Sequence, residues 1–316
     1  MALLVIVLGL QENVGTDYQS YYQIAEGIKN IGWIEARNET LFVYLVRFTQ
    51  RFSDPQLLFV FVGIIQMTFL MFIAREVKQL GFKLHHFFFL YFALSLTFFN
   101  QFNIIRQYIA VYIVVYAILK LMSGRTFLFI LLVGIAGLFH NSALFMLGLV
   151  LIKRFIEKRY SPVSITVLLL VLTIVSSFDL TNLWVRLLSF TGYANYIMGS
   201  YFDRMSFTGI ITKIPKIAVV LLSANLINHE DLDECRNWLL NMSYLACAVL
   251  ILSFSSSVVW RFYQYFDLFL VFPALLLFED RSQKHVSAFV WLALLFILVV
   301  KILLIPQGEY LYNSIL

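Results

Sequence analysis

Short polar motifs interrupt the long apolar runs of this sequence, and several contain a group that could do chemistry. In the clearest one, Asn103, Arg106 and Gln107 are spaced i, i+3 and i+4, so they share one face at the start of a predicted helix. An arginine near hydrocarbon costs about 2.5–3.5 kcal/mol on insertion scales, and its planar donor fork suits phosphate oxygens. The three residues are candidates for binding a phosphate group. The alternative is an arginine that reaches lipid headgroups or bonds buried carbonyls.

A second motif repeats this spacing with Arg261, Gln264 and Tyr265. A second cation here would suit a diphosphate. The alternative is an ordinary interfacial belt of Trp, Arg and Tyr. Asp267 lies off the Arg261 face of the helix, so we do not expect these two residues to pair within the helix. Arg204, which follows Asp203, is a weaker candidate cation, because two exposed residues of opposite charge can simply be solvated.

Two further residues could transfer protons. His140, followed by Asn141 and Ser142, interrupts an otherwise apolar run, and histidine accepts or donates a proton near neutral pH. The alternative is that these three residues cap the broken ends of a helix. Asp17, in Gly15-Thr16-Asp17-Tyr18, could orient a sugar hydroxyl or act as a base. A helix N-cap is an equally natural role for Asp17.

The elements that must position these residues are membrane-spanning helices. The sequence is 61% hydrophobic and 13% charged, with a mean hydropathy of +0.85. Continuous apolar runs without alternation indicate helices rather than a barrel, so we predict an all-α polytopic membrane protein. The net charge of +5 reflects orientation in the membrane, because the basic residues lie in short loops, and we expect no nucleic-acid partner. The acidic run 230–234 is not interpreted as a metal site, and we expect no cofactor.

Hydropathy predicts about ten transmembrane or re-entrant helices in one domain, 1–316. The predicted spans are 57–74, 84–99, 104–122, 163–178, 210–227, 238–257, 262–278 and 286–305, and residues 1–10 are apolar but too short to span. The positive-inside rule places Arg75, Lys78 and Lys83 in the cytoplasm. It also places the basic cluster 153–159 there if the run 127–152 enters and leaves by the same face. We therefore favour a hairpin or re-entrant element with His140 near its outer tip.

Under this topology the two long segments 11–56 and 179–209 face outward, on the same side as Arg106, His140 and Arg261. Both segments are rich in aromatic residues: Tyr18, Tyr21, Tyr22 and Trp33 in the first, and Trp184, Tyr193, Tyr196 and Tyr201 in the second. Two interpretations stay open. The residues form an interfacial aromatic belt, or they form a platform on which sugar rings stack.

The chain resembles the EpsG and Wzy-type bacterial polymerases, which build O-antigen, capsule or exopolysaccharide. The resemblance rests on Gly15-Thr16-Asp17-Tyr18 with Tyr21, on Asn103-x-x-Arg106-Gln107, on Phe139-His140-x-Ser142-Ala143-Leu144 and on Arg261-x-x-x-Tyr265. It implies a GT-C-like, metal-independent glycosyltransferase that transfers a glycan from one undecaprenyl diphosphate carrier to another lipid-linked repeat unit. The reaction would occur on the outer face of the bacterial cytoplasmic membrane, where a flippase and a chain-length regulator are possible partners.

This resemblance assigns roles to the candidate residues. Arg106 and Arg261, with Asn103, Gln107 and Arg204, would bind the diphosphate; His140 or Asp17 would take the acceptor proton; and Tyr18, Tyr21 and Tyr265 would bind sugar. An O-antigen-ligase-like transferase, or a transporter or flippase of lipid-linked sugars, could use the same arginines. Transporters often contain inverted repeats, and no convincing repeat is present in this sequence. A purely structural scaffold is disfavoured by the clustered polar residues within apolar runs.

Overall fold

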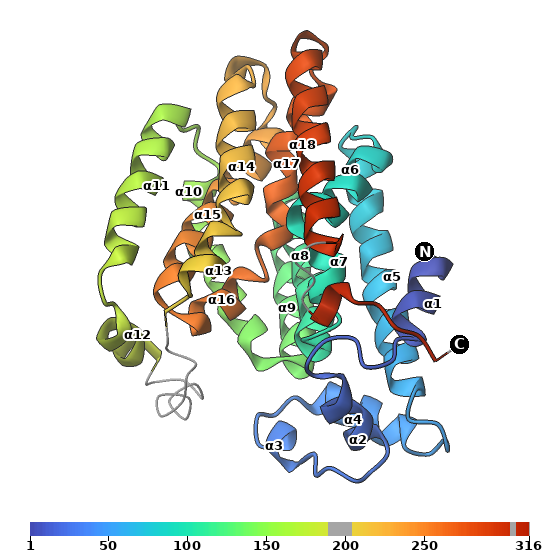
Figure 1. The fold of residues 1–316 in the computed structure, drawn as a ribbon. Coiled ribbons are helices and arrows are strands. Elements are labelled where there is room, and N and C mark those ends of the chain that lie inside the picture. The colour runs from blue at the N-terminus through green and yellow to red at the C-terminus, as the bar shows by residue number, and fades with distance from the viewer. Residues whose placement is uncertain (189–203, 304–307, 316) are drawn as a thin grey trace. The chain divides into compact units, whose positions relative to one another are not determined.

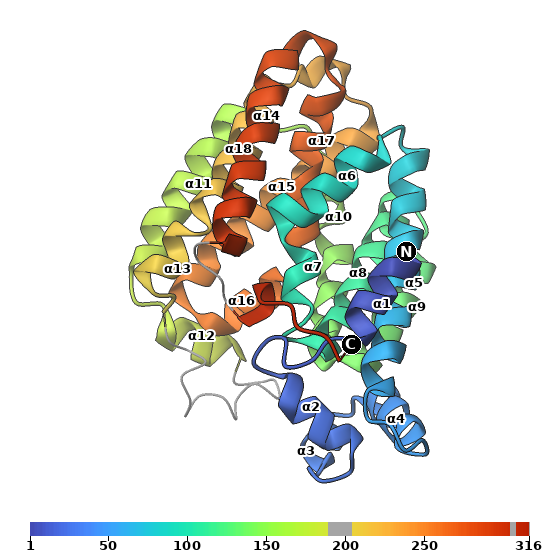
Figure 2. The ribbon, with the colours of Figure 1, turned by 45° about the vertical axis from the view of Figure 1, so that its right-hand side comes forward.

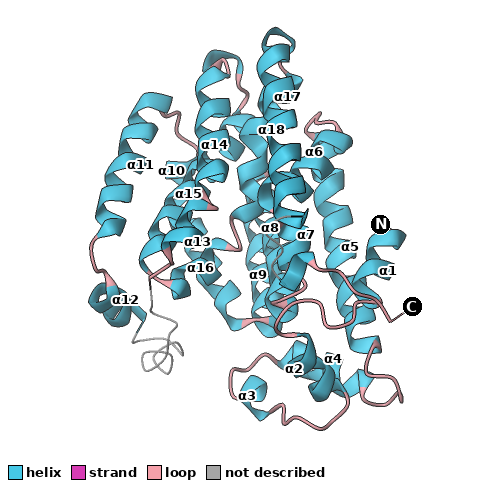
Figure 3. Cartoon of the chain, viewed as in Figure 1, coloured by secondary structure: helices cyan, strands magenta, loops and turns pink. Residues whose placement is uncertain are grey.

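The computed structural model describes residues 1–188, 204–303 and 308–315. Every regular element of these residues is helical (Figures 1 and 3), which confirms the all-α fold class. The chain divides into two units, one formed by Met1–Leu151 with Leu292–Leu316 and the other by Ile152–Trp291. Tyr193, Tyr196, Tyr201 and Asp203 lie outside the described residues.

The first unit is built around α8 (Ile105–Met122), and nearly all residues of α8 are buried. α5 (Leu57–Gln79) and α9 (Thr126–Phe139) pack along it, and α1 (Ala2–Gly9) packs against α5. A helix that is largely apolar on all sides suits such a central position, as it also suits contact with lipid. The shorter helices are α2 (Tyr18–Ala25), α3 (Gly32–Glu35), α4 (Thr40–Thr49), α6 (Leu84–Leu90) and α7 (Thr97–Asn100). Figures 1 and 2 show α2, α3 and α4 gathered near the beginning of α5.

The second unit is organised around α15 (Glu234–Leu252), which contacts α11 (Pro162–Ser177), α14 (Ile214–Leu226), α16 (Ser257–Tyr263) and α17 (Val271–Glu279). Its remaining helices are α12 (Thr181–Leu188) and α13 (Phe207–Ile211). Asn241 of α15 donates hydrogen bonds to the carbonyls of Ile156 and Lys158. These bonds satisfy carbonyls at the end of α10 (Leu149–Ile156) that the helix itself leaves unpaired. α10 and α18 (Lys284–Leu303) each belong partly to both units.

Several helices are long and apolar enough to cross a membrane, as the sequence predicts for a multi-pass protein. Within the described residues these are Leu57–Gln79, Ile105–Met122, Phe207–Leu226, Glu234–Ser255 and Lys284–Leu303. Two further pairs of helices qualify as bent spans. They are Pro162–Ser177 with Thr181–Leu187, bent by 99°, and Ser257–Tyr263 with Asp267–Glu279, bent by 67°.

The predicted span 84–99 is not a continuous α-helix. α6 is followed by a π-helical turn, Tyr91–Ser95, and the chain then passes through Leu96, whose φ of 59° is left-handed. The Ser95 hydroxyl donates to the Tyr91 carbonyl and accepts from the backbone N–H of Thr97. A side chain that bonds the local backbone in this way competes with the helical pattern, which explains the break at a position without Gly or Pro.

The chain also breaks at His140, where the sequence predicts a hairpin or re-entrant tip. His140 is extended, with φ −153° and ψ 112°, and a 3₁₀ segment, Asn141–Gly148, follows it. A Cβ added to Gly137 would lie 2.6 Å from Cδ2 of Leu144. In a straight helix residues seven positions apart are about 10 Å apart, so the 3₁₀ segment folds back beside the end of α9.

Candidate functional site

A buried carboxylate, Glu39, joins two of the residues that the sequence singles out. Its Oε2 lies 2.7 Å from Nη1 of Arg106, and its Oε1 lies 3.0 Å from Nδ1 of His140. The backbone N–H of Asn141 donates to the same Oε1 at 3.2 Å. All three residues are at least 95% buried. We call Glu39, Arg106 and His140 the Glu39 cluster.

Three elements of the first unit bring the cluster together. Arg106 is in the first turn of α8, and His140 is the extended residue that separates α9 from the 3₁₀ segment. Glu39 is the N-cap residue of α4, but its side chain makes no capping hydrogen bond to α4. It accepts instead from Asn141, the first residue of the 3₁₀ segment, and so satisfies a donor that a helix start leaves open.

Aromatic rings complete the surroundings of Arg106. Its guanidinium carbon lies 4.7 Å from the ring centre of Trp33 and 5.9 Å from that of Phe42. Trp33, on α3, is 40% exposed, whereas Phe42 is fully buried. Trp33 therefore contacts the buried guanidinium and is itself partly exposed at the surface of the unit.

Electrostatics keep Glu39 ionised. Burial alone would raise the pKa of Glu39. This effect is outweighed by the hydrogen bond and charge of His140, by the charge of Arg106 and by the hydrogen bond from the Asn141 N–H. The pKa of Glu39 is consequently lowered from its ordinary value. A carboxylate that binds Nδ1 of a histidine fixes the orientation of the ring and stabilises the protonated form, as in catalytic triads. Nε2 is then the nitrogen suited to accept a proton.

Asn103 has a structural role at the edge of this site. Its Oδ1 accepts hydrogen bonds from the backbone N–H and the hydroxyl of Thr16, and its Nδ2 donates to Glu309 at 3.0 Å. These bonds connect the Gly15-Thr16 turn and the C-terminal segment to the start of α8. Gln107, the next candidate along α8, is 3% exposed. Phosphate binding by Asn103 and Gln107 stays a prediction.

The candidates of the first outward segment lie on or beside α2. Asp17 is the N-cap residue of α2 and is half-buried, without a side-chain capping bond. Tyr18 and Tyr21 are 3% and 6% exposed, and the Tyr18 hydroxyl donates to Oε1 of Gln56. Burial, followed by the charges of neighbouring groups, raises the pKa of Tyr18 to about 12. The role of these two tyrosines in sugar binding stays a prediction, as does a catalytic role for Asp17.

The second unit contains Arg261, Tyr265 and Arg204. Arg261, on α16, is half-buried, and Tyr265 is fully buried. Asp267 forms an ion pair with Lys216 of α14 at 2.8 Å and accepts a hydrogen bond from Tyr263. The ion pair therefore joins Asp267 to a different helix, α14. Arg204 donates to the carbonyls of Ser176 and Ser177, so it caps the C-terminus of α11. Diphosphate binding by Arg261 and Arg204 stays a prediction.

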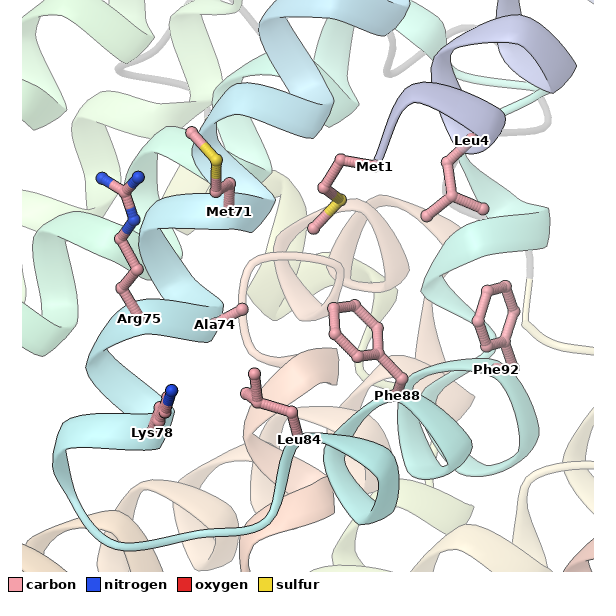
Figure 4. Close-up of a pocket in the computed structure, with 9 residues that line it drawn as sticks. All are labelled: Met1, Leu4, Met71, Ala74, Arg75, Lys78, Leu84, Phe88 and Phe92. Carbon is pink, nitrogen blue, oxygen red and sulfur yellow. The ribbon is translucent and has the colours of Figure 1, made fainter.

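Figure 4 shows a separate cavity of about 510 Å³ in the first unit. Residues of α5 with the spacing i, i+3, i+4 and i+7 line one side of it, and residues of α6, of the π-helical turn that follows α6 and of the N-terminal segment line the others. The lining residues are Met1, Leu4, Met71, Ala74, Arg75, Lys78, Leu84, Phe88 and Phe92. The lining is largely apolar and includes none of the candidate residues.

Glu39 is the one member of the cluster that the sequence does not reveal. It lies in a polar segment, where an acidic residue is common, and its contact Asn141 is 102 positions away. The only local signal is its position directly before the amphipathic helix α4. As for metals, no group of three His, Cys, Asp or Glu residues comes together in the described part of the chain.

Comparisons with known proteins give one match. No curated protein and no solved structure matches the chain. The model of the EpsG family matches residues 1–314, and this family supports a role of the polysaccharide polymerase type. Because the match covers nearly the full length, and because the motifs around Asp17, Arg106, His140 and Arg261 had indicated the same relationship, the chain belongs to the EpsG family.

Proposed function

We propose that this protein is a glycosyltransferase that polymerises undecaprenyl-diphosphate-linked oligosaccharide repeat units by en bloc transfer of the growing glycan. It acts on the outer face of the bacterial cytoplasmic membrane and makes a surface polysaccharide such as O-antigen, capsule or exopolysaccharide. The observation that carries the proposal is the Glu39 cluster. A carboxylate-oriented histidine and a guanidinium share one buried anion, so a proton acceptor and an anion-binding group are held side by side.

The reaction follows from these groups. The acceptor hydroxyl of one repeat unit gives its proton to Nε2 of His140, and its oxygen bonds to the anomeric carbon of the growing glycan. The bond from that carbon to the diphosphate breaks, and its electron pair stays on the diphosphate oxygen. Arg106 stabilises the charge that develops on this leaving group, a role that a metal ion fills in other glycosyltransferases. Glu39 stays ionised and stabilises the imidazolium that forms.

Replacement of Arg106 tests the proposal in cells. We expect Arg106→Ala to remain in the membrane and to leave single-repeat glycans in place of the polymer ladder, because the leaving group loses its cation. Lys120→Ala is a matched control. Lys120 is on the same helix, is 7% exposed and is also paired with a carboxylate, that of Glu76. An unchanged ladder in Arg106→Ala, at normal protein level, would overturn the proposal.

Purified protein separates the polymerase from the other functions. With one lipid-linked repeat as the sole substrate, a polymerase extends it and releases undecaprenyl diphosphate. A flippase moves the lipid across a vesicle without forming a glycosidic bond, and a ligase needs a different acceptor. His140→Ala should lower the rate of extension by about 10²–10⁴-fold, which is the usual contribution of a general base. His85→Ala is the control, because His85 is exposed and outside the cluster.

A further inference from the structure

The cavity of Figure 4 has an apolar wall and a cationic rim. Met71 and Ala74 of α5 form one side of the wall, and Phe88 of α6 contributes to the opposite side. Arg75 and Lys78 follow on α5 and are exposed at the rim. The volume of about 510 Å³ lies within the range of about 300–1,000 Å³ that is usual for ligand sites. The cavity is therefore large enough to hold part of a lipid or another small molecule.

The two cations at the rim are not neutralised by carboxylates of the described chain. Neither Arg75 nor Lys78 forms an ion pair within the described residues, and the guanidinium carbon of Arg75 lies 5.9 Å from the ring centre of Phe72. Glu76 is the one acidic residue of the sequence between the start of α5 and the end of α9, and it pairs with Lys120. The rim therefore has positive charge available to an anionic ligand.

The order of these groups along α5 matches the order of the groups in a phospholipid. α5 is long and apolar enough to cross a membrane, and Arg75 and Lys78 lie in its last two turns. Met71 lies nearer the middle of the helix, about 10 Å from Lys78 along the axis. A phospholipid likewise has its charged headgroup at the membrane surface and its acyl chains toward the centre of the bilayer.

The cavity lies toward the opposite end of the first unit from the Glu39 cluster. Arg106 is in the first turn of α8, whereas Lys120 is in its last turn and pairs with Glu76, the neighbour of Arg75. Arg106 and Lys120 are about 21 Å apart along the helix axis. A ligand in the cavity therefore does not occupy the proposed reaction site. The positive-inside rule predicts that Arg75 and Lys78 face the cytoplasm.

We propose that this cavity binds an anionic phospholipid of the cytoplasmic leaflet. The headgroup phosphate lies between Arg75 and Lys78, and the planar guanidinium of Arg75 donates two hydrogen bonds to phosphate oxygens. One acyl chain lies against Met71, Ala74 and Phe88, so its apolar surface is buried between α5 and α6. The bound lipid thus holds α6 against α5. This site goes beyond the proposed function and does not depend on it.

Lipid binding by the purified full-length chain tests the proposal. Delipidated protein in detergent is titrated with phosphatidylglycerol, which is anionic, or with phosphatidylcholine, which has the phosphate but no net charge, and bound lipids are counted by native mass spectrometry. We expect Arg75→Gln/Lys78→Gln to bind phosphatidylglycerol about ten- to thirtyfold more weakly, because two headgroup contacts are lost. Binding of phosphatidylcholine should change much less, since its choline cation is repelled by the same two residues.

Arg51→Gln/Arg125→Gln is the matched control for this double variant. It removes two exposed cations from the same unit, and neither residue lines the cavity. We expect it to keep the wild-type preference for phosphatidylglycerol. Equal losses in the two double variants would show that overall charge, rather than the cavity, attracts the lipid, and would overturn the proposal. An unchanged preference in Arg75→Gln/Lys78→Gln would overturn it as well.

A photoreactive lipid locates the binding site without any variant. Phosphatidylglycerol with a diazirine in one acyl chain is cross-linked to the wild-type protein, and the labelled peptides are identified by mass spectrometry. We expect labels on α5 near Met71 and on α6 near Phe88, and excess unlabelled phosphatidylglycerol should remove them. Labels confined to other helices would overturn the proposal. Stronger competition by undecaprenyl phosphate than by phosphatidylglycerol would also overturn it, because the cavity would then belong to the substrate lipid.

Discussion

At the scale of single residues, the site is determined by the need to pair buried charge. An unpaired ion in a protein interior costs several kcal/mol, so Arg106 requires an anion wherever the fold buries it. Glu39 meets this requirement and, through its other oxygen, also orients His140. One carboxylate therefore explains both the stability of the buried arginine and the geometry of the histidine.

Replacement of Glu39 should destabilise the protein in a pH-dependent way. The pKa of Glu39 is lowered in the folded state, so its contribution is present above the ordinary pKa of 4.5 and is lost as the pH falls through the lower folded value. We expect Glu39→Gln to lower the melting temperature of the detergent-solubilised protein at pH 7. Leaving one buried partner uncompensated typically costs about 3–5 kcal/mol. The difference in melting temperature between Glu39→Gln and wild type should shrink below pH 4.5.

Glu35→Gln is the control for this measurement. Glu35 lies four residues away and is paired with Arg47, but both side chains are substantially exposed. Exposed ion pairs contribute about 0–1 kcal/mol, so this variant should melt close to wild type at all pH values. Equal melting of Glu39→Gln and wild type at pH 7 would show that the carboxylate of Glu39 is not needed to compensate Arg106.

The contrast between Arg106 and Glu39 shows which part of the site could be predicted. Arg106 and His140 stand out in the sequence because a polar residue within an apolar run is costly and therefore informative. Glu39 does not stand out, because a carboxylate in a polar segment is inexpensive. Its pairing depends on the tertiary contact of α4 with the region around His140, which no local spacing encodes.

At the scale of elements, the turn before α2 depends on a glycine. Gly15 has a φ of +75°, and a Cβ at this position would collide with Oδ1 of Asn103. The absence of a side chain allows the backbone of Thr16 to donate to that oxygen. Asn103 precedes α8 and also bonds Glu309, so one close contact joins three distant segments of the first unit.

Two glycine variants separate backbone strain from this contact. Gly27 also has a positive φ, +84°, but nothing lies within 4 Å of the position of its Cβ. Gly27→Ala should therefore cost only the penalty of a left-handed L-residue, about 1–2 kcal/mol. Gly15→Ala should cost more, because Asn103 must also move and its hydrogen bond to Thr16 is strained. Thermal unfolding in detergent measures the loss of stability in both variants. Equal losses in Gly15→Ala and Gly27→Ala would show that the close contact between Gly15 and Asn103 is unimportant.

Hydropathy predicts some of these helices correctly and misses one of the breaks between them. Long apolar runs correctly predict α5, α8, α15 and α18, because a span needs about 20 apolar residues and little else. The break at Leu96 could not be predicted, since it arises from the bonds of the Ser95 side chain and no Gly or Pro marks it. The break at His140 could be predicted, because a polar group interrupts the apolar run. The reversal of direction that the positive-inside rule favours for the run 127–152 stays a prediction.

At the scale of the whole molecule, each unit buries its own ion pair, Arg106 with Glu39 in one and Lys216 with Asp267 in the other. Among the described ion pairs, these two have both partners almost fully buried, whereas Glu76, the partner of Lys120, is half-buried. A fully buried pair is expensive to form and contributes little net stability, so both pairs are candidates for a functional role. The proposed reaction also needs its arginines on the side of the membrane where the lipid-linked repeats are joined. Topology therefore decides which of the buried charges can meet the substrate.

Cysteine accessibility measures that topology. In a background without Cys235 and Cys247, a membrane-impermeant maleimide should label Asn30→Cys in spheroplasts, and should label Lys158→Cys only after permeabilisation. Lys83→Cys is the control, because the first long span places it inside whatever the arrangement of 127–152. Labelling of Lys158→Cys from outside would mean that the run 127–152 crosses the membrane once. The positive-inside order would then be inverted for the second unit, and Arg261 would face the cytoplasm while Arg106 faces outward. The diphosphate would in that case have to be bound by cations of the first unit alone, and Arg106 is the candidate cation of that unit.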